Sequence, residues 1–381
     1  MMESIKRCSR CLIPKSLENV TFDQNGVCSH CRKYEQDFAD WEKISDRRKQ
    51  EFEQILNAAK SLKRPYDCLV PLSGGKDSTY TLYLATRIYK LKTLAVTLDN
   101  GYLSQAAKDN IRNALQHCDA DHVFYAINRA NSTELFKEFV KRTGDFCNAC
   151  MRGINYSIEM AVNNFKIPLV IKGSGRRVQY ISQMKGLSHL NTPSYYENVL
   201  RGTEAHGKYK YLAGHKYKLE FQKIMGGIAD VAGFSRLLMM RFFPQHIGLY
   251  DYIYLPFPEI AAIIKKEMGW SDSSKTVEHL DCEMHDVPMH MMSLARPELG
   301  PNTLYYSGLI RQGIMSREKA LAKDEAERTA NRIPPELEKF LQDNNLTYGQ
   351  YVKFATTSDR GQFEPRLQVL ARDIYHKLRK Y

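Results

Sequence analysis

The stretch Pro71-Leu-Ser-Gly-Gly-Lys-Asp-Ser-Thr79 follows the apolar run Cys68–Val70 and decides how the rest of the chain is interpreted. Glycines, hydroxyls and a lysine after a strand predict a turn that binds phosphate through backbone N–H groups at a helix N-terminus. The turn is too short for the pattern G-x-x-x-x-G-K-S/T, and Asp77 stands where that pattern has Ser or Thr. A carboxylate is expected there only if a cation lies between it and the phosphates, so we predict that Asp77 binds Mg²⁺.

Short apolar runs alternate with longer amphipathic stretches from Tyr66 to about residue 175. We expect strands over residues 68–72, 93–98, 122–127 and 167–171, and helices over 79–89, 105–116 and 133–142. This alternation predicts an α/β fold with a doubly wound parallel sheet. Ligands of such sheets bind at the carboxyl ends of the strands, so residues 73–78, 99–102 and 173–175 should line one crevice. Beyond about Tyr180 we expect mostly helices, near residues 258–268, 316–332 and 366–380.

Two cysteine pairs near the N-terminus, Cys8-x2-Cys11 and Cys28-x2-Cys31, have the spacing of a four-thiolate zinc ribbon. A redox dithiol is the alternative. We predict a structural Zn²⁺ that stabilises a segment too small to fold by burial alone. The expected organisation is a zinc ribbon over 1–40, a helical linker over 41–64, an ATP-binding domain over 65–200 and a mostly helical substrate or partner domain over 201–381.

Composition and charge set the broad class of the protein. Of the 381 residues, 43% are hydrophobic and 26% charged, and no apolar stretch approaches the length of about 20 residues that spans a bilayer. Without the apolar core of a signal peptide we expect a cytoplasmic protein, with no membrane partner and with reduced cysteines. The net charge of +12 favours anionic partners such as nucleotides, nucleotide-linked sugars or RNA, although a generally basic enzyme is equally consistent. The basic, tyrosine-rich stretch 201–223 could clamp a nucleotide or form an exposed loop.

The motif S-G-G-K-D-S after the first predicted strand resembles the pyrophosphate loop of the adenylating ATP pyrophosphatases, the PP-loop superfamily. The resemblance implies a Rossmann-like fold in which Lys76 and Asp77 carry catalysis at the α-phosphate of ATP. Thr97–Gly101 is similar to the adenosine-binding segment of that superfamily, and Lys172–Gly175 to its later phosphate-side loop. The implied ATP-binding residues are Leu72, Ser73, Gly74, Gly75, Lys76, Asp77, Ser78, Leu98, Asn100, Gly101, Lys172 and Gly173.

A finer resemblance covers most of the chain. The segments C-x-x-C-L-I-P, T-F-D-Q-N-G-V-C-S-H-C, Cys147–Gly153 and His279–Cys282 are similar to those of the N-acetyl sugar amidotransferases of surface-polysaccharide biosynthesis. The resemblance implies lipopolysaccharide, O-antigen or nonulosonic-acid biosynthesis. The implied reaction adenylylates the acetamido oxygen of an N-acetylated, nucleotide-linked sugar and replaces it with ammonia, giving an acetamidino sugar, AMP and pyrophosphate. Because no glutaminase motif is recognisable, the ammonia is expected from separate glutaminase and cyclase-like subunits.

The alternative is a sulfurtransferase that thiolates tRNA or a small molecule after the same adenylylation. In thiolases of this superfamily, a C-x-x-C pair and one distant cysteine can hold an iron–sulfur cluster, and Cys147, Cys150 and Cys282 fit that pattern. The interpretations left open for these three residues are cluster ligands, a second metal site, a catalytic dithiol or sulfur relay, and buried core cysteines. Cys68 and Cys118 are expected to be buried small hydrophobes.

Overall fold

The computed structural model describes residues 5–17, 20–38, 40–175, 192–214, 240–272, 281–330, 332–359 and 361–365. Its centre is a five-stranded sheet in which every neighbouring pair is parallel and the order is β3-β2-β1-β4-β5. The strands are β1 (Cys68–Pro71), β2 (Thr93–Asp99), β3 (Ala120–Ala126), β4 (Leu169–Lys172) and β5 (Gln245–Gly248). The prediction of an α/β fold with a parallel sheet is confirmed.

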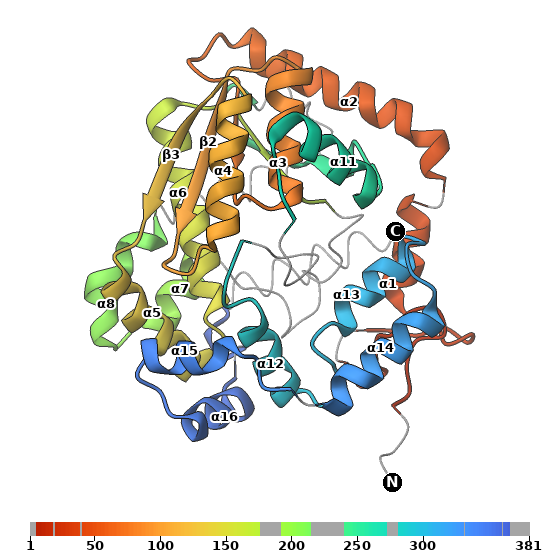
Figure 1. Cartoon of the computed structure of the whole chain (residues 1–381), viewed down its shortest axis with the longest axis vertical. Helices are drawn as coiled ribbons and strands as arrows, with labels where there is room; N and C mark the ends of the chain where they lie inside the picture. Colours follow the sequence, from red (N-terminus) through yellow and green to blue (C-terminus); the bar gives the residue numbers. More distant parts are fainter. Residues whose placement is uncertain are drawn as a thin grey trace.

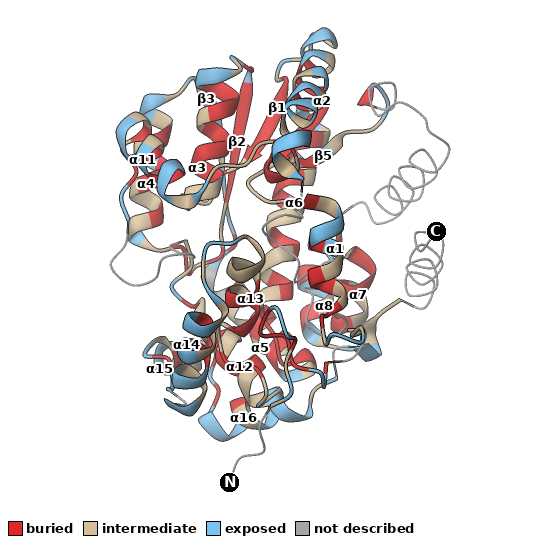
Figure 2. Ribbon diagram, turned by 90° about the vertical axis from the view of Figure 1, so that its right-hand side faces the viewer, coloured by how far each residue is buried: buried red, intermediate tan, exposed pale blue. Residues whose placement is uncertain are grey.

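Helices cover both faces of the sheet. Successive strand residues point to opposite sides, so each strand packs against both helix layers. On one face, Val70 and Ala95 belong to a buried cluster with α2 (Trp41–Ser61), α3 (Lys76–Tyr83), α4 (Gln105–His117) and α11 (Phe257–Met268). On the other face, Leu69 and Val96 pack against α6 (Cys147–Phe165). Figure 2 shows how thoroughly β1 and β2 are buried between these layers. This alternation is that of a doubly wound sheet.

Strand β5 was not predicted from the sequence. It pairs with β4 from Leu169↔Gln245 to Lys172↔Gly248, and α11 after it packs on α3 and α4. The sequence Gln-His-Ile-Gly is short and half polar, and only Ile247 of the strand is buried, which is typical of an edge strand. Residues from the predicted mostly helical part therefore complete the sheet and cover one of its faces.

A second, helical region lies beyond the carboxyl ends of the strands (Figure 1). Its buried cluster is rich in aromatic side chains, with Phe146 in ring contact with both Phe136 and Phe340. Its helices are α5 (Arg129–Thr143), α7 (Pro193–Leu200), α8 (Glu204–Tyr209), α12 (Asp286–Ala295), α15 (Glu336–Asp343) and α16 (Tyr348–Thr357).

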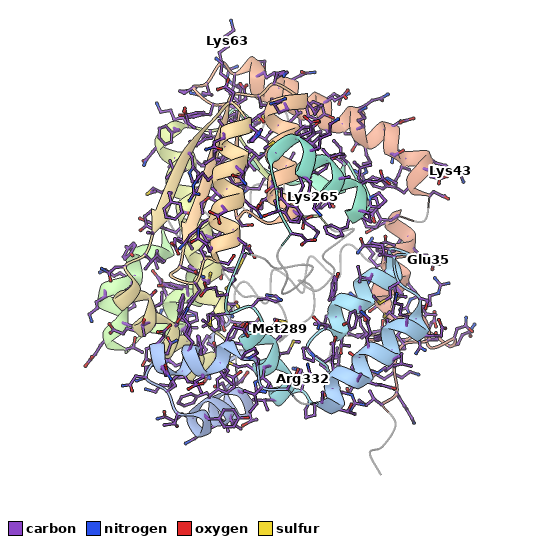
Figure 3. The ribbon with its side chains drawn as sticks, viewed as in Figure 1. Glu35, Lys43, Lys63, Lys265, Met289 and Arg332 are labelled. Carbon is purple, nitrogen blue, oxygen red and sulfur yellow. The ribbon has the colours of Figure 1, made fainter. Side chains whose placement is uncertain are left out.

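The N-terminal cysteine segment and α1 (Ser29–Phe38) pack against α13 (Thr303–Arg311) and α14 (Arg317–Ala330). Helix α2 then runs from this region along the sheet (Figure 1). Helix α2 is followed by a turn at Lys63, which has φ +50° and whose side chain projects from the edge of the molecule (Figure 3). Helix α2 thus lies within the helical linker expected over residues 41–64.

Some predicted features fall outside the described residues: His279, the part of the basic stretch from residue 215 onward, and the C-terminal helix over 366–380. Among the residues that the structure describes, no helix is both long and apolar enough to cross a membrane.

The contact between the cysteine segment and α14 contains a buried ion pair. Arg7 Nη2 lies 2.7 Å from Asp324 Oδ2, with the two side chains 5% and 0% exposed. The hydroxyl of Thr303 also donates to Asp324. We predict that Asp324→Ala lowers the free energy of unfolding by about 3–5 kcal/mol, because it leaves the Arg7 guanidinium buried without its counter-charge.

Urea denaturation measures this loss. The matched control is Asp109→Ala, since Asp109 pairs with Arg112 on the exposed surface of α4 and its loss should cost less than about 1 kcal/mol. Equal effects of the two substitutions would show that the buried pair does not hold the cysteine segment to α14.

Candidate functional site

The loop after β1 is a tight glycine turn that leads into α3. Gly74 has φ +79°, and a Cβ there would lie 2.3 Å from the carbonyl oxygen of Ala107 on α4. Glycine is therefore required at position 74 for two reasons: the left-handed backbone and the close approach of α4. Gly75 is the N-cap of α3, so the backbone N–H groups of the first turn of that helix point toward the loop.

The hydroxyl groups of Ser73 and Ser78 form hydrogen bonds within the loop. Ser78 Oγ accepts from the N–H of Ser73 at 3.2 Å and donates to the carbonyl of Gly75 at 3.0 Å. Ser73 Oγ accepts a long hydrogen bond from Gly75 N–H at 3.4 Å. Thr79, the last residue of the stretch, is completely buried.

Lys76 and Asp77 lie side by side at the start of α3, with Lys76 Nζ 3.3 Å from Asp77 Oδ2. The Lys76 ammonium also lies 5.3 Å from the ring centre of Phe257. The Tyr250 hydroxyl donates to Asp77 Oδ1 at 2.5 Å. Burial, and then the neighbouring Asp77 carboxylate, raise the pKa of Tyr250 well above its ordinary value, so the phenol stays a donor.

The loop after β4 touches the loop after β1. A Cβ on Gly173 would lie 2.6 Å from the backbone of Asp77, and one on Gly175 would lie 2.8 Å from that of Asp251. The sheet order places β1 and β4 side by side at the point where the chain turns from one half of the sheet to the other. Ligands of doubly wound sheets bind at this point. Lys172, at the end of β4, is only partly buried there.

The end of β2 lies one strand further along the same edge. Asp99 Oδ1 accepts from the N–H of Gly101 at 2.8 Å and Oδ2 lies 3.7 Å from Lys108 Nζ. Leu98 packs against Gly153 of α6, where a Cβ would lie 3.0 Å away. The side chain of Asn100 is buried, and its amide donates to Cys150 Sγ at 3.0 Å rather than facing open space.

Cys147, Cys150 and Cys282 gather around this end of β2. The segment containing Cys282 is hydrogen-bonded to Tyr102 and Ser104, and all three cysteines pack against the same aromatic cluster. Burial raises the pKa of Cys150 to about 11 and also raises that of Cys282. Across the described ranges, only the N-terminal cysteines form a group of three or more ligands close enough to hold one metal ion.

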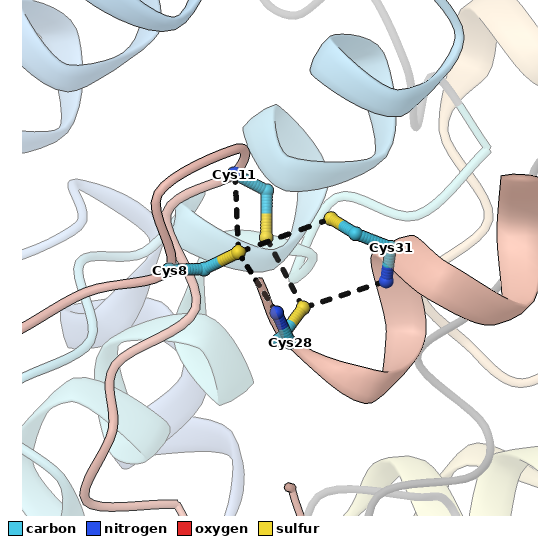
Figure 4. A group of neighbouring side chains, drawn as sticks. All are labelled: Cys8, Cys11, Cys28 and Cys31. Atoms are coloured by element: carbon cyan, nitrogen blue, oxygen red, sulfur yellow. Dashed lines mark hydrogen bonds between the residues drawn. The ribbon is translucent and has the colours of Figure 1, made fainter. Parts of the chain in front are cut away.

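That N-terminal group is Cys8, Cys11, Cys28 and Cys31, with all four sulfurs buried and within 4.8 Å of one another (Figure 4). The Sγ–Sγ distances are 4.0 Å for Cys8–Cys31 and 3.7 Å for Cys11–Cys28. A tetrahedral zinc site with Zn–S bonds of about 2.3 Å has sulfurs about 3.8 Å apart. The four residues therefore fit a zinc ion.

Backbone N–H groups point at these sulfurs. Cys8 Sγ accepts from the N–H of Cys28 at 3.2 Å and of Arg10 at 3.4 Å, and Cys28 Sγ accepts from that of Cys31 at 3.4 Å. The segment is thus built to hold thiolates.

Sequence reasoning missed several side chains that contact the β1 loop: Asn110, Tyr250, Phe257 and Trp270. The last three lie on β5 and α11 or directly after them, so no local signal links them to the loop.

No protein-family model matches the chain. It is 29% identical over 171 residues to an uncharacterised protein of Methanocaldococcus jannaschii, a match that covers 44% of this chain and 58% of the relative. The chain thus spans little more than half the length of that relative. NMN synthetase from Francisella tularensis aligns over 84% of this chain and 95% of its own, at 12% identity and a TM-score of 0.31. A similarity this low does not define the fold, and the parallel sheet described above stands on its own strand pairing.

The resemblance of the β1 loop to a pyrophosphate loop implies ATP turnover, and we predict that Gly173→Ala abolishes it, because the added methyl group cannot fit against the backbone of Asp77 and displaces the loop. Gly207→Ala is the matched control, since nothing lies within 4 Å of a Cβ at that helical glycine. Steady-state release of pyrophosphate measures the effect. Full activity of the Gly173 variant would place the reaction away from this crossing of the two loops.

We predict that purified protein holds about one tightly bound zinc ion, and that Cys28→Ser lowers both zinc content and the unfolding temperature. Cys118→Ser, outside the ribbon, is the control and should leave the zinc content unchanged. Metal analysis and thermal unfolding with and without a chelator make the measurement. Zinc-free protein of unchanged stability, with four freely reactive thiols, would contradict the prediction.

Proposed function

We propose that this chain is an ATP-dependent, AMP-forming enzyme of the PP-loop type that binds ATP at the β1 loop. One observation carries the proposal: a glycine turn with Lys76 and Asp77 at its helix start lies where the β1 and β4 loops meet. Backbone N–H groups, the helix dipole and the Lys76 ammonium suit the pyrophosphate part of a nucleotide. The carboxylate of Asp77 suits a divalent cation bound between it and the phosphates.

We further propose that the activated group is the acetamido oxygen of an N-acetylated sugar. An amide oxygen is a poor leaving group, and attack of that oxygen on the α-phosphorus of ATP releases pyrophosphate and makes it part of AMP. Ammonia then attacks the activated carbon, AMP departs with the original oxygen, and an acetamidino group remains. The resemblance of several segments to N-acetyl sugar amidotransferases supports this choice of substrate.

Lys76 and Asp77 have distinct roles in this reaction. Lys76, held beside the Phe257 ring, stabilises the charge that develops as pyrophosphate leaves. Asp77 would hold Mg²⁺, which when bound neutralises the phosphates and orients them for in-line attack. Gly75 N–H and the following N–H groups of α3 contribute hydrogen bonds to the same oxygens.

We propose a separate glutaminase with a cyclase-like subunit as the source of ammonia, and a nucleotide-linked sugar of lipopolysaccharide, O-antigen or nonulosonic-acid biosynthesis as the substrate. The zinc ribbon has a structural role in this proposal, because its sulfurs are buried against α13.

Sulfur transfer is the competing proposal, and the position of Cys147, Cys150 and Cys282 near the end of β2 favours it. A sulfur relay needs a thiolate. The raised pKa of Cys150, about 11, keeps this thiol protonated at neutral pH unless a metal binds it. Cys150 therefore does not serve as a free thiolate in such a relay.

The test uses ATP, Mg²⁺, ammonium and an N-acetylated nucleotide sugar whose acetamido oxygen carries a heavy isotope. We predict AMP and pyrophosphate as products, the heavy oxygen in AMP, and a sugar lighter by the difference between oxygen and NH. Lys76→Ala and Asp77→Asn should abolish AMP release, whereas the exposed control Lys63→Ala should not.

Other outcomes separate the alternatives. Formation of ADP and phosphate would contradict adenylylation altogether. A product made heavier by exchange of oxygen for sulfur, seen with sulfide or stimulated by tRNA, would establish the competing reaction instead.

A further inference from the structure

Three aromatic side chains from one distant segment contact three residues of the β1 loop and the start of α3. Trp270 contacts Gly74, Phe257 lies beside Lys76, and Tyr250 contacts Asp77. We refer to Tyr250, Phe257 and Trp270 as the aromatic bracket. Tyr250 and Trp270 are separated from their loop partners by 173 and 196 residues. The bracket lies on the part of the chain that forms β5 and α11, which the sequence did not link to nucleotide binding.

Trp270 and Asn110 determine which way one peptide of the loop faces. The Gly74 carbonyl accepts from Trp270 Nε1 at 3.0 Å and from Asn110 Nδ2 at 3.2 Å. Because a trans peptide is planar, its N–H points opposite to its carbonyl. The N–H of Gly75 is therefore turned away from these two donors and toward the inside of the loop, where Ser73 Oγ lies.

Both donors are held in place by their own surroundings. Trp270 is 3% exposed and Asn110 is fully buried. Asn110 also exchanges hydrogen bonds with the backbone of Ser271, donating to its carbonyl at 3.0 Å and accepting from its N–H at 2.9 Å. The residues after α11 are thus joined to the loop directly by Trp270 and through Asn110, which leaves the Gly74 peptide little freedom to flip.

Tyr250 acts on the other side of the loop. Its hydroxyl engages Asp77 Oδ1 and leaves Oδ2 on the side of Lys76. Tyr250 is 2% exposed, and the β4 loop fixes its backbone, because Tyr250 N–H donates to the carbonyl of Ser174 at 3.1 Å. A carboxylate with one oxygen held in this way presents the other in a fixed direction.

We propose that the aromatic bracket is part of the ATP site, with Trp270 and Tyr250 as positioning residues that control two separable properties. Trp270 sets the affinity of the loop for the phosphates themselves, through the Gly75 N–H. Tyr250 sets the affinity for the divalent cation, through Asp77. This inference rests on the proposed function and assigns to it residues that no motif identifies.

The experiment compares Trp270→Phe and Tyr250→Phe in the full chain. Calorimetric titration with inorganic pyrophosphate in the absence of divalent cations measures the first property. The Mg²⁺ concentration for half-maximal AMP release measures the second. Loss of one hydrogen bond corresponds to about a threefold to tenfold change in either quantity.

We expect Trp270→Phe to weaken metal-free pyrophosphate binding by that factor, and Tyr250→Phe to leave it unchanged. Conversely, Tyr250→Phe should raise the Mg²⁺ requirement, with a smaller effect of Trp270→Phe. Asn110→Ala removes the second donor to the same carbonyl and should repeat the Trp270 result if Trp270→Phe does not fold.

Matched controls exist for both variants. The chain has two tryptophans, and the other, Trp41, packs against Phe38 and Tyr254. Trp41→Phe should leave both quantities unchanged, and its remaining tryptophan, Trp270, should change emission when pyrophosphate binds. Tyr306 also donates to a carboxylate, that of Glu327 on α14, so Tyr306→Phe is the control for Tyr250→Phe.

The outcomes distinguish this inference from the proposed function. If the unaltered protein binds neither pyrophosphate nor ATP, the proposed function is wrong. If it binds both and forms AMP, but the bracket variants match their controls, the bracket only packs the fold. Equal changes of both properties in both variants, or a lower Mg²⁺ requirement of Tyr250→Phe, would overturn the division of roles.

Discussion

Close backbone approach around the β1 loop is the constraint on which the site depends. Gly74 meets α4, Gly173 meets the first turn of α3, and Gly248 meets the carbonyl of Ser174, each at a distance too short for a methyl group. Side chains at these crossings would separate β1 from β4 and from the turn after β5. Because glycine has no side chain at these positions, the loops after β1 and β4 and the turn after β5 bring their polar backbone groups to one edge of the sheet.

The local features of this arrangement could be predicted from the sequence. Strands β1 to β4 have apolar runs that periodicity detects, and the glycine turn before Lys76 is a short-range signal. Strand β5 could not be predicted, because four residues with one buried side chain carry no periodicity. The contacts of Tyr250 and Trp270 with the loop could not be predicted either, since they depend on how α11 packs after β5 has joined the sheet.

For the cysteine segment, too, the sequence predicts the local arrangement of the cysteines but not how the segment packs against the rest of the chain. The two C-x-x-C pairs predict that four sulfurs meet, because each pair closes a turn whose N–H groups point at sulfur. Nothing in those pairs predicts that Arg7 reaches Asp324 on α14 or that the N–H of Leu12 donates to Ser307 Oγ on α13. These contacts join the ribbon to helices 295 and 317 residues further along the chain. Zinc binding would therefore stabilise α13 and α14 as well as the ribbon itself.

The charges around the loop bear on the order of events in the proposed reaction. Lys76 and Asp77 lie close enough to offset one another, so the loop alone offers a polyphosphate little net positive charge. A cation held by Asp77 would restore that charge, and the neutral Tyr250 would orient the carboxylate without adding another. Across the site, burial keeps Cys150 protonated beside Asn100. The proposed activating groups are thus charged and lie at the β1 loop, whereas the Cys150 thiol at the end of β2 is neutral. A nucleophile delivered as neutral ammonia after activation is consistent with this separation.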